Sequence, residues 1–408
     1  MQRVVVTGMG LISALGQDLD TVWDRLHIYK NAVRVLPELK TFKGLNSHLG
    51  SVIDDFQIPQ SFTRKTIRTM GKVALLATAS ADKAVTQAGL SAEDLTNGRT
   101  GVAYGSSSGS PISLVDFYEM LKTHEVKTVS SGTYIKMMPQ TCAVNLSLYF
   151  KTTGRLIPTN TACTSGALSI GLAYESIKHG LQDVMIAGGA EEFSSTQVAV
   201  FDTLYATSTK NDDPQKTPIP FDKNRDGLVI GEGAGTLILE SLEHAQNRGA
   251  KIYAEIVGFG TNTDGAHITQ PSTQTMALAL KNAVSDANIS TAEIGYVNAH
   301  GTATLQGDIA ETTAVEATFQ RPVAISSLKS YIGHTLGACG TLEAIITILM
   351  LNNNWYAPTL NLSEIDPACA KLDYIKDEGR AIETCYVMSN NFAFGGINTS
   401  LIFKKFEQ

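Results

Sequence analysis

The residues around Cys163 have the clearest capacity for chemistry in this sequence. The stretch from Pro158 to Ala167 reads PTNTACTSGA and places the cysteine where a short strand-like segment ends and a helix of small residues begins. A thiol at a helix N-terminus faces the positive end of the helix dipole, which favours the thiolate. Its backbone N–H can also stabilise an oxyanion. One interpretation is a nucleophile for acyl transfer, and the other is a buried structural cysteine.

Two histidines further along the chain have comparable settings. His300 stands at the end of a strand-like run, in the stretch VNAHGTAT that begins at Val297. His334 lies in the glycine-rich turn SSLKSYIGHTLGA, which begins at Ser326, contains Lys329 and opens another helix of small residues. These companions favour the catalytic interpretation of the cysteine. We interpret the histidines without such a setting as surface or structural residues: His27, His48, His124, His179 and His244.

Alternating strands and helices must position these side chains. Strand-like runs are predicted at residues 3–7, 101–104, 183–187, 235–240, 251–257, 294–298, 323–326, 385–389 and 400–403. Helical patterns are predicted at residues 72–88, 165–179, 276–287 and 340–351. Alternation of this kind predicts an α/β fold in which helices pack on mixed sheets.

A weak internal repeat suggests two related halves. Residues 84–91 and 283–290 each end a helix and lead into a strand, and Gly89 and Asn288 occupy matching positions at the helix ends. Both residue types suit a left-handed C-cap. If the repeat is genuine, residues 1–250 carry the cysteine and residues 251–408 carry the two histidines. Chance similarity between two helix ends is the alternative.

Composition excludes several classes of protein. The chain has 408 residues, 43% of them hydrophobic, and a net charge of −7, which argues against nucleic acid as the main partner. No apolar run approaches the roughly 18 residues that span a membrane, and the N-terminus lacks signal-peptide features, so a cytoplasmic protein is expected. No Walker loop or HExxH motif is present. The cysteines are odd in number and form no CxxC pair, which predicts neither a disulfide framework nor a metal site: Cys142, Cys163, Cys339, Cys369 and Cys385.

Several spaced motifs together resemble one family. TACTSG, NAHGTAT and KSYIGHTLGA occur in that order, with RDG…GEGAG at residues 225–235, NFAFGGIN at 391–398 and VVTGMG at 5–10. This set resembles the elongating β-ketoacyl-acyl carrier protein synthases of the thiolase superfamily. The resemblance implies a five-layered αβαβα fold built from two duplicated halves, usually dimeric. It also implies decarboxylative Claisen condensation of a cysteine-bound acyl chain with malonyl-carrier protein.

The same resemblance assigns the catalytic roles. Cys163 would accept the acyl chain, and His300 and His334 would serve malonyl decarboxylation and condensation. Two imidazole N–H donors aimed at an enolate oxygen stabilise the charge that develops there. Lys329 would complete the catalytic group as a lysine that orders the histidine loop and pairs with Glu343. A role as catalytic base is disfavoured, because the sequence shows no desolvating context for it.

Substrate-holding residues follow from the resemblance as well. The backbone N–H groups of Cys163 and Phe394 would form the oxyanion hole, and Phe394 would be the gate that moves when an acyl chain enters. Thr269, Thr302 and Thr304 would hydrogen-bond the pantetheine arm. No cofactor is expected, since the substrates arrive on that arm.

The sequence departs from the family around the acyl pocket, which Ser108 and Phe201 would line. Ser108 stands where the family commonly has a bulky apolar residue, so a longer or more polar pocket is expected. Ala393 replaces a glycine before the gate and should stiffen it, because alanine lacks the backbone freedom of glycine. Cys339 replaces a usual alanine. A specialised polyene or polyketide-like pathway is one hypothesis, and ordinary drift is the other.

A basic segment is the candidate docking site for the partner protein. Arg64, Lys65, Arg68 and Lys72 lie at roughly helical spacing and correspond to the docking helix of the family. Carrier proteins of these pathways are acidic, so an acidic enzyme needs a local basic patch. A solvated helix face is the alternative. The chain is expected to act as a homodimer or as a heterodimer with a ketosynthase-like paralogue.

Three other activities fit the sequence less well. A thiolase uses a second catalytic cysteine where this chain has His334, and Cys339 does not fit that role. A chain-length partner subunit lacks the nucleophile, whereas Cys163 is present. An initiating ketosynthase pairs its cysteine with one histidine and an asparagine, whereas two histidines occur in this sequence.

Overall fold

Eleven strands form one mixed sheet in the computed structural model, which describes residues 1–407. Their order is β12-β10-β9-β14-β15-β8-β1-β7-β6-β4-β5. The strands of the first half are β1 (Val4–Ser13), β4 (Thr100–Gly105), β5 (Leu156–Thr159), β6 (Val184–Glu191) and β7 (Gly233–Ser241). Those of the second half are β8 (Ala254–Thr263), β9 (Ile294–Asn298), β10 (Ala324–Ser326), β12 (Asp373–Tyr374), β14 (Tyr386–Ala393) and β15 (Ile397–Lys404).

The strand directions repeat outward from the centre of the sheet. Strands β5, β4 and β6 are parallel, and β7 and β1 are antiparallel to their neighbours. On the other side β10, β9 and β14 are parallel, and β15 and β8 are antiparallel. The two series meet only where three residues of β1 pair with β8, from Val4–Ile256 to Val6–Ala254. Two copies of one five-stranded pattern, with β12 added parallel to β10 at one edge, therefore build the sheet.

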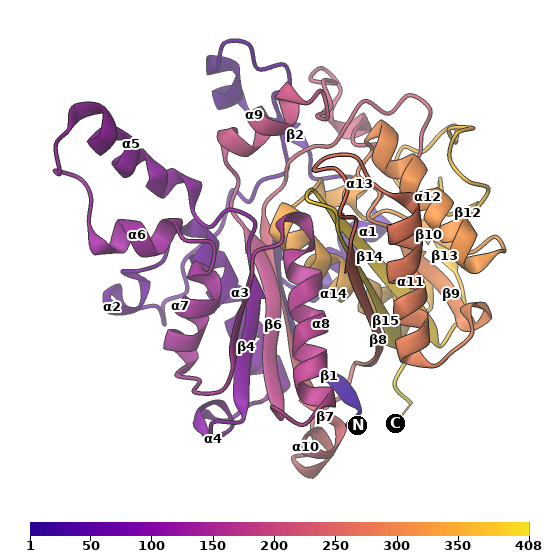
Figure 1. Cartoon of the computed structure of the whole chain (residues 1–408), viewed down its shortest axis with the longest axis horizontal. Coiled ribbons are helices and arrows are strands. Elements are labelled where there is room, and N and C mark those ends of the chain that lie inside the picture. The colour runs from indigo at the N-terminus through magenta and orange to yellow at the C-terminus, as the bar shows by residue number, and fades with distance from the viewer. Residues whose placement is uncertain (408) are drawn as a thin grey trace.

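Helices complete five layers, which Figure 1 shows side by side. Helices α3 (Lys72–Ala88) and α7 (Thr141–Phe150) cover one outer face, and α11 (Thr273–Ala287) and α12 (Leu305–Phe319) cover the other. Helices α8 (Ser165–Lys178) and α14 (Cys339–Asn353) lie between the two parts of the sheet. The expected αβαβα arrangement is confirmed. The other helices are α1 (Leu19–His27), α2 (Arg64–Ile67), α4 (Ala92–Thr96), α5 (Leu114–Thr123), α6 (Ser131–Met137), α9 (Ser195–Thr203), α10 (Leu242–Asn247) and α13 (Lys329–Ile332).

Glycines let the outer helices approach the central strands in the same way in both halves. A Cβ at Gly10 of β1 would lie 2.1 Å from the Ser80 carbonyl oxygen of α3, and one at Gly260 of β8 would lie 2.1 Å from the Ala279 carbonyl oxygen of α11. Such contacts are impossible for any side chain. Close packing of each outer helix against its strand therefore depends on glycine at that place.

The predicted elements agree with the structure in type. Helix α3 has the predicted bounds, and α8, α11 and α14 differ from prediction by one to three residues at an end. Both predicted C-caps are left-handed, with φ of 66° at Gly89 and 52° at Asn288. The hydrogen bonds of these caps satisfy carbonyl groups that the helix leaves free.

The expectation about apolar runs was wrong for one segment. Leu336–Asn353 is long and apolar enough to cross a membrane, with a mean hydropathy of 1.3, but 83% of it is buried inside the protein. It contains α14, which packs against α8 and strands of both halves. The apolar composition is explained by this central position, because no face of the helix is left to carry polar residues.

Candidate active site

A strained turn presents Cys163. Ala162 has a φ of 50°, a left-handed value that residues with a side chain rarely adopt, just before the cysteine and the start of α8. The Ser165 hydroxyl donates to the Ala162 carbonyl (2.7 Å) and accepts from the Thr161 N–H (3.0 Å). These bonds hold the turn, so the sulfur is presented at the N-terminal end of a buried helix.

His334 is fixed in position and in tautomer by backbone groups. Its N–H donates to the Val229 carbonyl (2.7 Å), and its carbonyl accepts from the Gly231 N–H (2.9 Å). The ring Nδ1 accepts from the Leu336 N–H (3.3 Å), so in the neutral ring the proton must sit on Nε2. Nε2 lies 3.1 Å from the Cys163 sulfur and therefore points its N–H at the nucleophile.

His300 is held by a buried carboxylate and an amide. The Glu311 carboxylate accepts from the backbone N–H groups of His300 and Gly301, both at 2.7 Å. The Asn391 amide donates to His300 Nδ1 (3.4 Å) and to Glu343 (2.8 Å). The His300 ring is thereby also left with its proton on Nε2. The sequence could not show these tautomers, because the partners come from distant parts of the chain.

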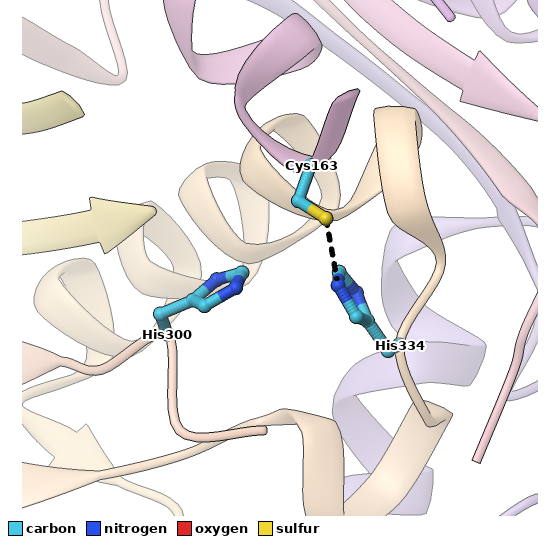
Figure 2. Close-up of side chains that lie close together, drawn as sticks. All are labelled: Cys163, His300 and His334. Atoms are coloured by element: carbon cyan, nitrogen blue, oxygen red, sulfur yellow. Dashed lines mark hydrogen bonds between the residues drawn. The ribbon is translucent and has the colours of Figure 1, made fainter. Parts of the chain in front are cut away.

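The three side chains converge on one space, as Figure 2 shows. The ring centroids of His300 and His334 are 5.2 Å apart at an interplanar angle of 88°. Cys163, His300 and His334 are 5%, 7% and 2% exposed. An atom placed between them would face the sulfur and two imidazole N–H groups in surroundings with little water, where hydrogen bonds to a developing negative charge are strong.

Both histidines are neutral. Burial lowers the pKa of each well below its ordinary value, and the charge of Lys329 lowers both further. The Lys329 ammonium hydrogen-bonds Glu343, and both side chains are buried. Burial alone would lower the pKa of Lys329, but the charge and hydrogen bond of Glu343, together with Cys339 and Glu311, outweigh burial and raise that pKa. Nothing in the sequence indicates this desolvated setting, yet Lys329 remains a charged positioning group.

The helix N-terminus was expected to favour the thiolate of Cys163, but burial of the thiol has the larger effect on its pKa. Burial raises the pKa of the thiol to about 12, although Lys329 and the backbone N–H groups of Phe394 and Cys163 act in the opposite direction. The helix end therefore does not produce a thiolate in the resting protein. Cys163 and Phe394, whose N–H groups are the predicted oxyanion donors, both line the cavity described below.

The cluster of Cys163, His300 and His334 also has the composition of a metal site, because its potential ligand atoms lie within 4.8 Å of one another. A metal bound at Nε2 of either ring would require the proton on Nδ1. Nδ1 of His334 faces the Leu336 N–H, and Nδ1 of His300 faces the Asn391 amide N–H. These donors oppose the tautomer that a metal needs, so the residues do not fit a metal ion.

A cavity of about 510 Å³ opens at the cysteine. All three predicted pantetheine residues, Thr269, Thr302 and Thr304, line it. Phe201 and Phe394 line it as well, with ring centroids 5.2 Å apart. Two glycines with left-handed φ, at residues 395 and 396, follow Phe394. The structure therefore brings the pantetheine residues, the gate and one of the two acyl-pocket residues to a single cavity.

Ser108, the other predicted acyl-pocket residue, does not line this cavity, and the expected opening is corrected. Its hydroxyl donates to Glu191 (3.0 Å) and accepts from the Gln197 amide (3.1 Å). Burial raises the pKa of Glu191 to about 7, while hydrogen bonds from Ser107 and Gly337 oppose the rise. The Ser108 hydroxyl is therefore engaged in these hydrogen bonds and does not extend the cavity.

The docking residues differ in availability. Arg64 and Lys65 begin α2, and both are exposed, as is Arg68 at its end. Lys72 instead begins α3 and forms a 2.7 Å ion pair with Glu232, which is fully buried. The Lys72 side chain is 42% exposed, so it remains a candidate docking residue, but its charge is paired with Glu232 whereas those of Arg64, Lys65 and Arg68 have no ion-pair partner among the described residues.

Three site residues escaped the sequence analysis: Glu191, Glu311 and Asn391. Glu311 stands among buried residues of α12 such as Ala310, Ala314 and Val315, and an acidic residue on an apolar helix face was the available signal. Asn391 lay inside a motif already recognised, NFAFGGIN, without a role. Glu191 carried no signal beyond its place at the end of a buried strand.

Known proteins are similar to the chain over its length. Residues 1–245 match the family described as beta-ketoacyl synthase, N-terminal domain, and residues 253–363 match the corresponding C-terminal domain. The chain is 38% identical over 413 residues to 3-oxoacyl-[acyl-carrier-protein] synthase 2 of Vibrio harveyi, with 99% of each protein covered.

Solved structures show the same similarity. A beta-ketoacyl synthase from Burkholderia phymatum STM815 is 55% identical, with a TM-score of 0.98 and both chains fully covered. The ishigamide ketosynthase/chain length factor is 29% identical, with a TM-score of 0.92 and both chains fully covered. These neighbours share the thiolase-like fold described above.

Proposed function

The chain belongs to the β-ketoacyl synthase family and is a 3-oxoacyl-[acyl-carrier-protein] synthase, and on that premise we propose how its own residues carry the reaction. The observation that carries the assignment of roles is the convergence of Cys163 with two neutral histidines whose Nε2–H groups face one space. The partner is an acyl carrier protein that delivers first the acyl and then the malonyl group.

In the first step the Cys163 sulfur attacks the acyl thioester on the carrier protein. The new oxyanion is stabilised by the backbone N–H groups of Cys163 and Phe394, both of which lower the pKa of the Cys163 thiol. The thioester to the carrier breaks, the acyl group stays on Cys163, and the thiol proton leaves on the pantetheine sulfur. Because the resting thiol has a pKa of about 12, deprotonation accompanies attack rather than preceding it.

In the second step malonyl-carrier protein occupies the same cavity and loses carbon dioxide. The enolate oxygen lies between the Nε2–H groups of His300 and His334, which stabilise its charge. The enolate carbon attacks the acyl carbonyl, and the bond to the Cys163 sulfur breaks to give 3-oxoacyl-carrier protein. The sulfur leaves as a thiolate and takes up a proton from water, which restores the resting thiol. Lys329 and Glu343 stay outside the reacting atoms and hold the ring of His300 through Asn391.

Mass spectrometry of the protein after incubation with acyl-carrier protein, then with malonyl-carrier protein, tests this function. We expect an acyl adduct on Cys163 that disappears with release of carbon dioxide and formation of 3-oxoacyl product. Cys163→Ala should give no adduct, whereas Cys385→Ala, which removes an exposed cysteine, should behave as wild type. Absence of an adduct from every acyl donor would overturn the proposal.

We propose that the active protein is a dimer formed through the α5–α6 region and the free edge of β5. Helices α5 and α6 project from the body of the molecule (Figure 1), and β5 is the last strand of the sheet. Apolar side chains are exposed in this region, which is unfavourable unless another surface covers them. They are Ile112, Leu114, Val115, Tyr118, Leu121 and Leu156.

The partner in that dimer is a second copy or a ketosynthase-like paralogue. The similarity to a ketosynthase/chain length factor supports the second choice, and the intact active-site residues of this chain support the first. Light scattering of the protein expressed alone separates them. A stable, active homodimer would exclude an obligate paralogue, and an inactive monomer would exclude the homodimer.

We also propose that residues 1–250 and 251–408 are two homologous halves, which the repeated strand order supports. The last strand of the first half, β7, ends at Ser241, and β8 of the second begins at Ala254. We propose a cytoplasmic location for the protein, as we propose an acyl carrier protein for its partner.

A further inference from the structure

A buried carboxylate joins two turns that lie far apart in the sequence. Glu191 is the last residue of β6 and is fully buried. Its Oε2 accepts from the N–H of Ser107, in the loop after β4, and from the N–H of Gly337, in the turn after His334 (2.8 and 2.9 Å). A Cβ at Gly189, two residues before Glu191 in β6, would lie 2.3 Å from the Gly337 carbonyl oxygen. The turn after His334 therefore packs directly on β6 and is bonded to the carboxylate at the end of that strand.

This turn has a strained backbone at the residue that contacts the His334 ring. Leu336 has a φ of 46°, a left-handed value that is unfavourable for a residue with a side chain. In this conformation the Leu336 N–H donates to Nδ1 of His334 (3.3 Å). Rotation of the peptide unit between Thr335 and Leu336 would return φ to an ordinary negative value, but it would also turn the N–H away from the ring. The hydrogen bond to Nδ1 therefore depends on the strained conformation.

Two hydrogen bonds oppose relaxation of the turn. The Ala338 N–H donates to the Thr335 carbonyl (3.0 Å) and holds the peptide unit before Leu336. The Gly337 N–H donates to Glu191 and holds the peptide unit after Leu336. Without the carboxylate, the buried Gly337 N–H would be unpaired, which is unfavourable, so the strained turn would gain by rearranging. Glu191 thus supplies one of the two anchors of Leu336.

The position of the proton on His334 depends on the Leu336 N–H. Within residues 1–407 this N–H is the only hydrogen-bond partner of Nδ1, whereas Nε2 faces the Cys163 sulfur. A neutral ring whose Nδ1 accepts a hydrogen bond must carry its proton on Nε2. If the Leu336 N–H turned away, Nδ1 would be free to take the proton. Nε2 would then lack the proton that it donates to the enolate oxygen.

We propose that Glu191 is a positioning residue for the reaction: by holding Gly337, it keeps the Leu336 N–H on Nδ1 of His334 and the proton on Nε2. This inference rests on the proposed function, because it takes that Nε2–H group as a donor to the enolate. Glu191 does not line the cavity, so it touches no reacting atom. It therefore affects decarboxylation through His334, and not acylation of Cys163, which uses the thiol and backbone N–H groups.

Two rates measured on the purified full-length enzyme distinguish this role from a merely structural one. They are the acylation of Cys163 by acyl-carrier protein and the release of carbon dioxide from malonyl-carrier protein. In Glu191→Ala we expect carbon dioxide release to fall about 10- to 100-fold and acylation to change by less than about twofold. The loss is smaller than the roughly 10²- to 10³-fold caused by removal of a donor, because the His334 ring remains.

Two conservative variants grade the effect. Glu191→Asp draws the acceptor back by one methylene group and keeps its charge, so carbon dioxide release should fall about fivefold with acylation unchanged. Glu191→Gln keeps an oxygen that accepts from Gly337, and its amide N–H can donate to the Ser108 hydroxyl. Both rates in Glu191→Gln should therefore stay near those of wild type.

The neighbouring carboxylate provides the matched control. Glu192 is also buried, but it accepts instead from the Val73 N–H (2.9 Å) and the Ser110 hydroxyl (2.8 Å). Glu192→Ala should therefore lower the melting temperature without changing the ratio of the two rates.

Nitrogen-15 NMR of the histidine rings reports the tautomer itself. The His334 signals, identified by their loss in His334→Ala, should show the proton on Nε2 in wild type and Glu191→Gln, and partly on Nδ1 in Glu191→Ala. A wild-type ratio of the two rates in both Glu191→Ala and Glu191→Asp would overturn the inference, as would an unchanged tautomer in Glu191→Ala or loss of carbon dioxide release in Glu191→Gln. If the proposed function fails, the wild-type enzyme itself neither acylates Cys163 nor releases carbon dioxide.

Discussion

The two halves of the molecule repeat one local structure and use it for different ends. In the first half Ala162, with a φ of 50°, starts a short 3₁₀ turn that runs into the central helix α8. In the second half Leu336, with a φ of 46°, starts the same kind of turn before the central helix α14. The matching second residues are Cys163 and Gly337. One is the nucleophile, and the other donates its N–H to Glu191.

The difference shows what the repeated local structure supplies and what depends on individual residues. Both turns put a backbone N–H and a side-chain position at the start of a buried helix. At Cys163 the side chain faces the cavity, whereas at Gly337 a Cβ would lie 2.6 Å from the Ser107 nitrogen and 2.8 Å from Glu191 Oε2. The second half therefore cannot carry a nucleophile at residue 337. It contributes His334, which precedes its turn, and His300, which precedes β10.

The largest effect should come from a variant that impairs condensation but keeps acylation of Cys163. His300→Ala should still allow acylation of Cys163, which uses the thiol and the N–H groups of Cys163 and Phe394, but should lower condensation by roughly 10²- to 10³-fold through loss of one donor to the enolate. Carbon dioxide release from malonyl-carrier protein is the measurement. His179→Ala, at the exposed end of α8, is the control. Unchanged carbon dioxide release in His300→Ala would contradict the division of roles.

Alanine substitutions at residues 163 and 337, the two matching positions, should lower the free energy of unfolding by different amounts. Gly337→Ala should lower the free energy of unfolding by about 3 kcal/mol, because the new Cβ overlaps a backbone nitrogen and a carboxylate oxygen. Cys163→Ala should cost only about 1 kcal/mol, because it removes one atom beside a cavity. Urea unfolding measures both. Gly132→Ala, where the nearest atom is 3.4 Å away, is the control, and equal costs at 163 and 337 would refute the steric argument.

The buried carboxylate that holds the His300 loop should make stability depend on pH. Burial raises the pKa of Glu311 to about 8 from an ordinary 4.5. Between these values the folded protein keeps a proton that the unfolded chain has released, so stability falls as pH rises, by up to about 1.4 kcal/mol per unit. Glu311→Gln should flatten the slope of the free energy of unfolding between pH 7 and 8. Glu316→Gln, exposed on the same helix, should keep the wild-type slope, and an unflattened slope in Glu311→Gln would disprove the assignment.

The smallest effect should come from the basic segment around Arg68 in the first half, the candidate docking site for the carrier protein. Arg68→Glu should raise KM for the carrier protein several-fold at low salt and less at high salt, because exposed charges steer association and are screened. Lys72→Met should instead lower stability, because it leaves the Glu232 carboxylate buried without its partner. Lys281→Glu on α11 is the control. A salt-independent KM in Arg68→Glu would remove Arg68 from the docking surface.

Much of the site followed from the sequence because its signals are local. Cys163, His300 and His334 each lie in a short motif of small and hydroxyl residues at the end of a strand or the start of a helix. Helix α3 and both left-handed caps followed from residue type and spacing. Such features depend on the few residues around them, so one sequence is enough to predict them.

The tertiary structure decided everything that depends on partners far apart in the chain. It buried Cys163 deeply enough to raise the pKa of its thiol, and it fixed both histidine tautomers through Leu336 and Asn391. It also committed Lys72 to Glu232, 160 residues away, and Ser108 to Glu191. The sequence determined which groups can react, because that is a property of residue type. Only folding determined their protonation and availability, because desolvation and long-range hydrogen bonds exist only once the chain is packed.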